Sequence, residues 1–293
     1  MPKNNLLKNK TIIITGANKG IGYEFAKYFL NKNCKLILIG RNKARNDISL
    51  KMLIKHSNNK TNIHFETLDI SNTKKVDKFF ITIFKKYKKI DVLINNAGIY
   101  GPKGDFDKIP WKEFKKTLNI NLFGSIYFIK KLLPHFKENN YGRIIQLSGG
   151  GATSAFPFFS PYSVSKTAIV RFIENISKEV SKYNIALNSI APGPVNTGML
   201  EEVLKAGPTI VGKRFYEKSV QQKNNGGTNI NMIISLAEFL ITRKDNKING
   251  RLISAIWDNW KVFDKKINIF KNSEFGTLRR ISGKDRKLNI FDK

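Results

Sequence analysis

Short, continuous apolar runs alternate along this chain with longer segments whose apolar residues recur at helical spacing. A strand reads as a continuous apolar run when both of its faces are buried, which is typical of parallel sheets covered by helices on both sides. The alternation therefore predicts an α/β fold with a doubly wound parallel sheet. The runs lie at residues 12–14, 36–39, 92–94, 144–147 and 185–190, and the helical segments at 21–30, 76–87, 111–133 and 162–180.

The motif order along the chain predicts one domain over residues 1–260, a single Rossmann-type sheet with helices on both faces. The stretch at about 197–228 is rich in glycine and lysine, which favours a mobile lid. Residues 261–293 read as a basic C-terminal extension. This extension could lie over a neighbouring subunit, contact an anionic substrate or remain a solvated end.

The formal net charge of +30 is the one unusual bulk property of this 293-residue chain. Such a charge can indicate a polyanion partner, for example nucleic acid. Here the basic residues are spread over many segments, whereas proteins that bind nucleic acid concentrate charge and interleave it with aromatic or arginine side chains. We therefore disfavour nucleic-acid binding and attribute most of the charge to the solvated surface.

The sequence carries no sign of a membrane or metal partner. No apolar stretch approaches the ~20 residues that a membrane-spanning helix needs, and residues 1–10 lack the apolar region of a signal peptide, so we expect a soluble cytoplasmic protein. The single cysteine, Cys34, precedes an apolar run and is interpreted as a packing residue. His56, His64 and His135 lack the spacing of metal ligands, so we expect no metal site.

The first apolar run leads directly into a glycine-rich sequence, TGANKGIG, which a helical segment follows. A tight strand-to-helix turn needs a residue without a Cβ, and a pyrophosphate needs close approach of the backbone. Gly16, Gly20 and Gly22 can meet these needs, and a helix N terminus presents N–H groups and a positive dipole end to phosphates. In this context the sequence predicts a dinucleotide site, not merely a turn.

The spacing of these glycines resembles the TGxxxGIG motif of the short-chain dehydrogenase/reductase family. Further motifs of that family follow in the same order: Asp69-Ile70 after the third predicted strand, and the NNAG sequence from Asn95 to Gly98 after the fourth. In the family the aspartate contacts the adenine of a nicotinamide dinucleotide. The resemblance extends over about residues 10–256 and implies an oxidoreductase.

The residue at the end of the second strand bears on the choice of cofactor. An acidic residue there would accept hydrogen bonds from a ribose 2′-OH and repel a 2′-phosphate. This chain has Arg41 instead. An arginine can form a charge-assisted, bidentate contact with phosphate, and Lys19 in the glycine-rich turn could add to it. We therefore expect NADP(H) to be favoured over NAD(H).

Tyr162 and Lys166 are one helical turn apart in a predicted helix, so the phenol and the ammonium share a face. A nearby cation favours the phenolate, so we expect Lys166 to lower the pKa of Tyr162 from its usual value near ~10. The pair matches the family's YxxxK motif. The resemblance implies that Tyr162 exchanges a proton with the substrate oxygen and that Lys166 tunes it and holds the ribose.

Two further catalytic residues are implied by the resemblance. Asn121 matches a helix asparagine that anchors a proton-conducting water. Ser148 is the nearest candidate for a serine that hydrogen-bonds the substrate carbonyl, although the family's serine more often lies one residue nearer to the tyrosine, at Gly149 here. The glycines after Ser148 could return it to the site, Thr153 or Ser154 could supply the hydroxyl, or this donor could be lost.

The sequence PGPVNT resembles a family motif that contacts the nicotinamide and the pyrophosphate. Together the motifs predict an enzyme, a homodimer or homotetramer, that interconverts a small-molecule carbonyl and alcohol by hydride transfer with NADP(H). The alternative is a dinucleotide-binding regulatory protein with impaired catalysis, which the displaced serine would support. The resemblance assigns the cofactor to Gly16, Asn18, Lys19, Gly20, Ile21, Gly22, Arg41, Asp69, Ile70, Asn95, Ala97, Gly98, Tyr162, Lys166, Pro192, Gly193, Val195 and Thr197.

Overall fold

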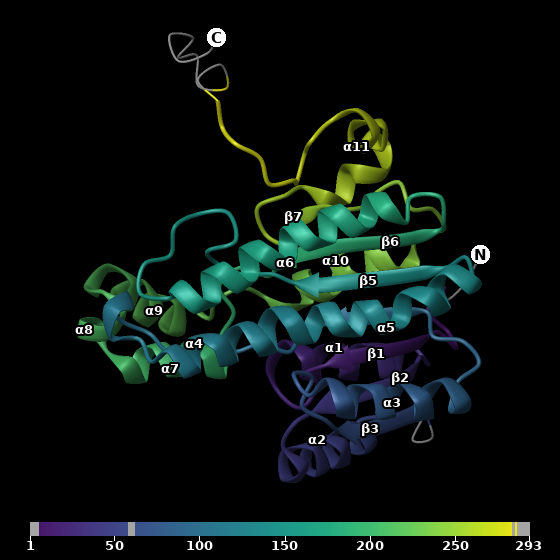
Figure 1. Cartoon of the computed structure of the whole chain (residues 1–293), viewed down its shortest axis with the longest axis horizontal. Helices are drawn as coiled ribbons and strands as arrows, with labels where there is room; N and C mark the ends of the chain where they lie inside the picture. The colour runs from purple at the N-terminus through teal and green to yellow at the C-terminus, as the bar shows by residue number, and fades with distance from the viewer. Residues whose placement is uncertain (1–5, 58–61, 283–284, 286–293) are drawn as a thin grey trace.

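A seven-stranded parallel sheet runs through the protein, whose computed structural model describes residues 6–57, 62–282 and 285 (Figure 1). Within these residues the strand order is β3-β2-β1-β4-β5-β6-β7, and every neighbouring pair is parallel. The strands are β1 (Thr11–Thr15), β2 (Lys35–Gly40), β3 (Ile63–Thr67), β4 (Val92–Asn95), β5 (Gly142–Leu147), β6 (Ile185–Ala191) and β7 (Leu252–Ser254). The predicted doubly wound α/β sheet is confirmed.

Helices connect the strands and cover both faces of the sheet (Figure 1). They are α1 (Gly20–Asn31), α2 (Lys43–Lys55), α3 (Thr73–Lys86), α4 (Trp111–Leu118), α5 (Ser125–Glu138), α6 (Ser160–Glu179), α7 (Gly198–Ala206), α8 (Pro208–Val211), α9 (Lys213–Asn225), α10 (Ile230–Thr242) and α11 (Asn268–Asn272), with 3₁₀ turns η2 (Phe106–Lys108) and η4 (Trp260–Lys266) and a π-helical turn η3 (Asn119–Gly124). None of the described helices is both long and apolar enough to cross a bilayer.

Successive residues of the central strands face opposite sides of the sheet. In β1, Ile12 and Ile14 pack into a buried cluster with α1, α2 and α10, whereas Ile13 packs into a second cluster with α3, α5 and α6. All three side chains are fully buried. Because neither face of the strand meets water, apolar side chains are favoured on both faces, which explains the continuous apolar runs in the sequence.

The strand order reverses at β1, which pairs with β2 on one side and with β4 on the other. In open α/β sheets the crevice at such a point, beyond the carboxyl ends of the strands, is where ligands bind. The turn after β1 and the loop after β4 meet there, because the Asn96 Nδ2 donates to the carbonyl oxygens of Thr15 and Gly16 at 3.0 and 3.1 Å.

Helices α7, α8 and α9 form the region predicted as a lid, and they gather at the end of the sheet where β5 terminates (Figure 1). Thr197 caps α7, because its Oγ1 accepts a hydrogen bond from the Met199 N–H at 3.3 Å. An ion pair of 3.3 Å between Lys103 and Glu202 joins α7 to the loop after β4. The mobility of this region stays a prediction.

The chain after β7 packs along the edge of the sheet. Trp260, Phe263 and Phe270 are buried in the same cluster as α1 and α10. Arg251 donates to the carbonyl oxygens of Ser273 and Phe275 at 2.9 and 2.7 Å. The first part of the predicted basic extension therefore contributes to the apolar core.

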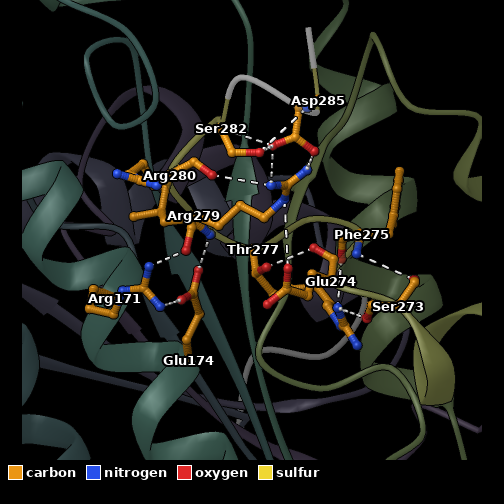
Figure 2. A network of polar contacts seen from close by, with 12 residues as sticks. Arg171, Glu174, Ser273, Glu274, Phe275, Thr277, Arg279, Arg280, Ser282 and Asp285 are labelled. Atoms are coloured by element: carbon orange, nitrogen blue, oxygen red, sulfur yellow. Dashed lines mark hydrogen bonds and ion pairs between the residues drawn. The ribbon is translucent and has the colours of Figure 1, made fainter. Parts of the chain in front are cut away.

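Polar contacts hold the segment after α11 against helix α6 (Figure 2). The buried Glu174 carboxylate accepts a hydrogen bond from the Leu278 N–H at 2.7 Å and forms an ion pair with Arg171. Arg279 and Asp285 form a further ion pair at 2.7 Å. Residues 283–284 and 286–293 of the predicted extension lie outside the described residues.

Candidate active site

The turn between β1 and α1 brings the backbone close to the loop after β4. Gly16 has a φ of +65°, and a Cβ there would lie 2.8 Å from the Ala97 Cα. A Cβ on Gly22 would lie 2.3 Å from the Gly16 carbonyl oxygen. Both positions therefore require glycine, Gly16 for the turn and Gly22 for packing α1 against it. Gly22 does not line the cavity described next.

A cavity opens above this turn at the carboxyl edge of the sheet. Helix α1 begins here, and the side chain of its N-cap residue, Lys19, makes no capping hydrogen bond. The backbone N–H groups of the first turn, at Gly20 and Ile21, therefore remain available to an anion such as a pyrophosphate. The predicted cofactor residues that line this cavity are Gly16, Asn18, Lys19, Gly20, Ile21, Arg41, Asp69, Ile70, Ala97, Gly98 and Thr197.

Two arginines lie at the solvent-exposed end of the cavity. Arg41 follows β2 as predicted, and Arg45, in the first turn of α2, was not foreseen. The Asn42 side chain caps α2 by accepting from the Arg45 N–H at 2.9 Å. Asn18 donates to Asn46 at 2.7 Å and so ties the glycine-rich turn to α2. Arg41 precedes α2, so no helical spacing links the two arginines; the signal that could have identified Arg45 is its place in the first turn of the helix that follows Arg41.

The two asparagines of the NNAG sequence lie in different environments. Asn95, predicted to contact the cofactor, is 1% exposed, donates to the Ser125 carbonyl oxygen at 3.1 Å and does not line the cavity. Asn96 lines the cavity instead. Asp69 also lies on the cavity wall, and its Oδ1 accepts hydrogen bonds from the Ser71 N–H and hydroxyl at 2.9 and 2.7 Å.

A second cavity adjoins the first, because Ile21, Thr197 and Met199 line both. The phenol of Tyr162 lies in its wall, with the predicted nicotinamide-contacting residues Pro192, Gly193 and Val195 nearby. Helices α7 and α9 close the far side. The remaining lining residues are Tyr100, Gly149, Gly150, Pro194, Leu200, Val203, Phe215, Ser219 and Gln222.

Tyr162 lies in an aromatic environment and is only 7% exposed. Its ring packs edge-on against Tyr100 and Phe156, with centroid distances of 4.8 and 6.4 Å. The predicted lowering of the Tyr162 pKa by Lys166 is wrong for this geometry. Burial raises the pKa of Tyr162, and the proximity of Tyr100 adds to the rise, because both disfavour a phenolate.

Lys166 lies one helical turn beyond Tyr162, and its Nζ is 5.6 Å from the centroid of the tyrosine ring. The Nζ donates to the Leu147 carbonyl oxygen at the end of β5, at 2.8 Å. It also lies 3.7 Å from the position of a Cβ on Gly98, a residue that lines the first cavity. Burial lowers the pKa of Lys166 to about 8.

Asn121 joins the loop after β4 to helix α6. It lies in η3, and π-helical turns within helices are frequent at functional sites. Its Nδ2 donates to the Ile99 carbonyl oxygen at 2.8 Å and to the Ser165 hydroxyl at 3.0 Å, and its Oδ1 accepts from the Ile99 N–H at 2.9 Å. The position of a Cβ on Gly98 is 3.4 Å from the Asn121 Oδ1. Tyr162 therefore lies in the wall of the second cavity, whereas Lys166 and Asn121 line neither cavity and lie close to Gly98 in the wall of the first.

Comparison with known proteins agrees with this geometry. Residues 10–207, well over half of the chain, match the family model described as short chain dehydrogenase. The chain belongs to the short chain dehydrogenase family. Within that family it is 34% identical over 195 residues to mouse dehydrogenase/reductase SDR family member 7B, a match that covers 66% of this chain and 60% of the mouse protein. The chain thus matches about three fifths of that relative's length.

Other members of the family match over a larger share of this short chain dehydrogenase. The 3-oxoacyl-(acyl-carrier-protein) reductase of Buchnera aphidicola is 29% identical over 247 residues, which cover 83% of this chain and 94% of the relative. The solved structure of ElxO with NADP bound superimposes with a TM-score of 0.73 at 26% identity, over 84% of this chain and 97% of that one. Levodione reductase, at 22% identity and a TM-score of 0.76 over 84% and 96% of the chains, shares the fold.

The serine of the family has no clear counterpart in this short chain dehydrogenase. The Ser148 Oγ is buried without a hydrogen-bond partner among the described residues, and Ser148 lines neither cavity. Thr153 and Ser154 are exposed and also line neither cavity. Gly149, at the family's serine position, faces the second cavity together with Gly150. None of the three predicted hydroxyls therefore reaches the site in this structure.

Sequence reasoning missed the aromatic wall of the second cavity. Tyr100 lies two residues after NNAG, whereas Phe215 comes from α9, far along the chain. No motif marks Phe215, because its proximity to Tyr162 depends on how the lid helices fold back over the sheet. The NNAG motif itself could have indicated Tyr100, since residues close behind it must lie near the same edge.

Proposed function

We propose that this short chain dehydrogenase is an NADP(H)-dependent oxidoreductase that interconverts a carbonyl compound and an alcohol. The observation that carries the proposal is the position of Tyr162 in the wall of the second cavity, with Lys166 and Asn121 close to Gly98 in the wall of the adjoining first cavity. One cavity has the features of a dinucleotide site, and the other holds a buried phenol. A proton donor beside such a site is what the reduction of a carbonyl by a hydride donor requires.

The residues of the first cavity fit a nicotinamide dinucleotide. The uncapped N terminus of α1 would hold the pyrophosphate, and Asp69 and Ile70 would contact the adenine. Arg41 and Arg45 would receive the 2′-phosphate of NADP(H). The NADP-bound structure of ElxO, at 26% identity, supports this preference. The cofactor, when bound, would supply the hydride in reduction and accept it in oxidation.

The buried phenol of Tyr162 is suited to donate a proton. Because burial raises its pKa, the hydroxyl stays protonated at neutral pH and can deliver its proton to the substrate oxygen as that oxygen gains charge. Lys166, with a pKa lowered to about 8, is still largely charged at neutral pH and stabilises the phenolate that remains. Asn121 fixes the Ile99 backbone beside this pair, so that the geometry persists between turnovers.

The second cavity favours a neutral, apolar substrate. Its lining includes Tyr100, Phe215, Leu200 and Val203, and within the described part of the chain no charged side chain lines it. This is notable in a protein with a net charge of +30. A carboxylate or phosphate on the substrate would lose its hydration and would find only neutral donors there, such as Ser219 and Gln222. We therefore propose an apolar ketone or aldehyde, or the corresponding alcohol.

Screening the purified protein against a panel of carbonyl compounds tests this function. Each compound is supplied with NADPH or with NADH, and oxidation of the cofactor is followed by absorbance. We expect turnover with NADPH and with apolar ketones, and weaker turnover with analogues that carry a carboxylate or a phosphate. Tight NADPH binding without turnover of any compound in either direction would instead favour a regulatory dinucleotide-binding protein.

A further inference from the structure

Gly149 lies directly against the reacting hydroxyl of Tyr162. A Cβ built on Gly149 would be 2.1 Å from the Tyr162 Oη and 3.0 Å from the Cζ, far inside van der Waals contact. The φ of Gly149 is not positive, so its backbone conformation alone does not require glycine. What requires glycine is the space that the Tyr162 hydroxyl occupies.

The Tyr162 ring is not free to move out of the way. Tyr100 packs against it at 4.8 Å and Phe156 at 6.4 Å, and both belong to a cluster that Phe159 and Phe215 complete. Phe156 and Phe159 are stacked at 4.4 Å. Because closely packed rings cannot shift singly, a side chain at position 149 would displace the hydroxyl by about 1 Å or more, or would distort the glycine loop.

The neighbouring hydroxyl does not replace the one that the family has at this position. Ser148 donates its backbone N–H to the Ile190 carbonyl oxygen at 2.8 Å, which fixes it at the end of β5. Its Oγ is buried and lines neither cavity. Tyr162 is therefore the hydroxyl in the wall of the second cavity that lies beside Lys166.

We infer that Gly149 is a positioning residue. Because it has no side chain, the Tyr162 hydroxyl can occupy the space beside it, and the site works without a serine hydroxyl at either position 148 or position 149. The inference rests on the proposed function, since it concerns how the same phenol is held. It predicts that the residue usual in the family at this position, serine, is harmful here.

Four variants test the inference. Gly149→Ala and Gly149→Ser should each lower kcat by roughly 10²-fold, the cost of misplacing a reacting group by about 1 Å, while the Kd for NADPH stays within about twofold. Ser148→Ala should keep kcat within about threefold. Gly150→Ala is the steric control, because a Cβ there meets Phe156 only at an ordinary 3.7 Å. The decrease in kcat of Gly150→Ala should be far smaller than that of Gly149→Ala.

A double-mutant cycle separates positioning from general damage to the loop. In a Tyr162→Phe background the Oη is gone, so Gly149→Ala should cause no further loss of the residual turnover and a smaller drop in the unfolding temperature than it causes in the wild type. Equal effects in the two backgrounds would overturn the inference. So would Gly149→Ser with wild-type kcat, or a 10²-fold loss in Ser148→Ala alone. Full turnover in Tyr162→Phe would instead overturn the proposed function.

Discussion

Replacing Arg41 by alanine tests the basis of the proposed preference for NADP(H). Arg41 lines the dinucleotide cavity next to Arg45, and its side chain is exposed. A hydrogen bond to a charged group contributes roughly 1.5–3 kcal/mol, and each ~1.4 kcal/mol is a factor of ten in Kd. Because solvent screens this position and Arg45 remains, we expect the lower end of that range. The Kd for NADPH should rise about tenfold, and the Kd for NADH should not change.

Titration of the fluorescence of each reduced cofactor measures both constants on the same protein. The difference in the Kd for NADPH between wild type and variant should become smaller as the salt concentration rises, because the lost contact is electrostatic. Lys43→Ala is a matched control: Lys43 also lies at the start of α2, pairs with Asp47 at 3.5 Å and does not line the cavity. An equal loss of affinity for both cofactors, or tighter binding of NADH by the wild type, would refute the reasoning.

Three other residues give measurable outcomes. Lys166 loses its charge as pH rises through about 8, so kcat/KM for carbonyl reduction should be level below that pH and fall above it, and Lys166→Arg should move the fall to higher pH. Asn121→Ala removes both bonds to Ile99 and the bond to Ser165, so turnover should drop by roughly 10²-fold and the unfolding temperature should fall, because buried polar groups lose their partners. Glu174→Ala leaves the Leu278 N–H without its acceptor and should lower the free energy of unfolding by ~1–3 kcal/mol in urea titration, whereas Glu174→Gln should cost less.

The central strands could be predicted because burial on both faces leaves a continuous apolar signature, as at Ile12, Ile13 and Ile14. Strand β3, with the sequence IHFET, has no fully buried side chain and lies at the edge of the sheet, so it gives no such signature. The packing of Phe263 and Phe270 into the core was also not foreseen, because their segment is polar and basic overall.

The candidate site was predictable where a local motif fixes a local geometry, as in the glycine-rich turn and the Tyr162–Lys166 spacing. It was not predictable where the outcome depends on tertiary burial. The expected fall in the Tyr162 pKa assumed that the charge of Lys166 has the largest effect on that pKa. Instead, the aromatic cluster desolvates the phenol and raises its pKa. Ser148 likewise does not line the second cavity, because its backbone is fixed at the end of β5, and sequence spacing does not reveal this.

Turnover of Tyr162→Phe is the most direct measurement of the central claim. The variant keeps the ring that packs against Tyr100 and loses only the Oη that would donate the proton. With a carbonyl substrate found in the panel, kcat should fall by roughly 10²–10⁴-fold, the usual contribution of a general acid, while the Kd for NADPH stays unchanged. Wild-type turnover by Tyr162→Phe would contradict the assignment of Tyr162 as the proton donor and the oxidoreductase mechanism built on it.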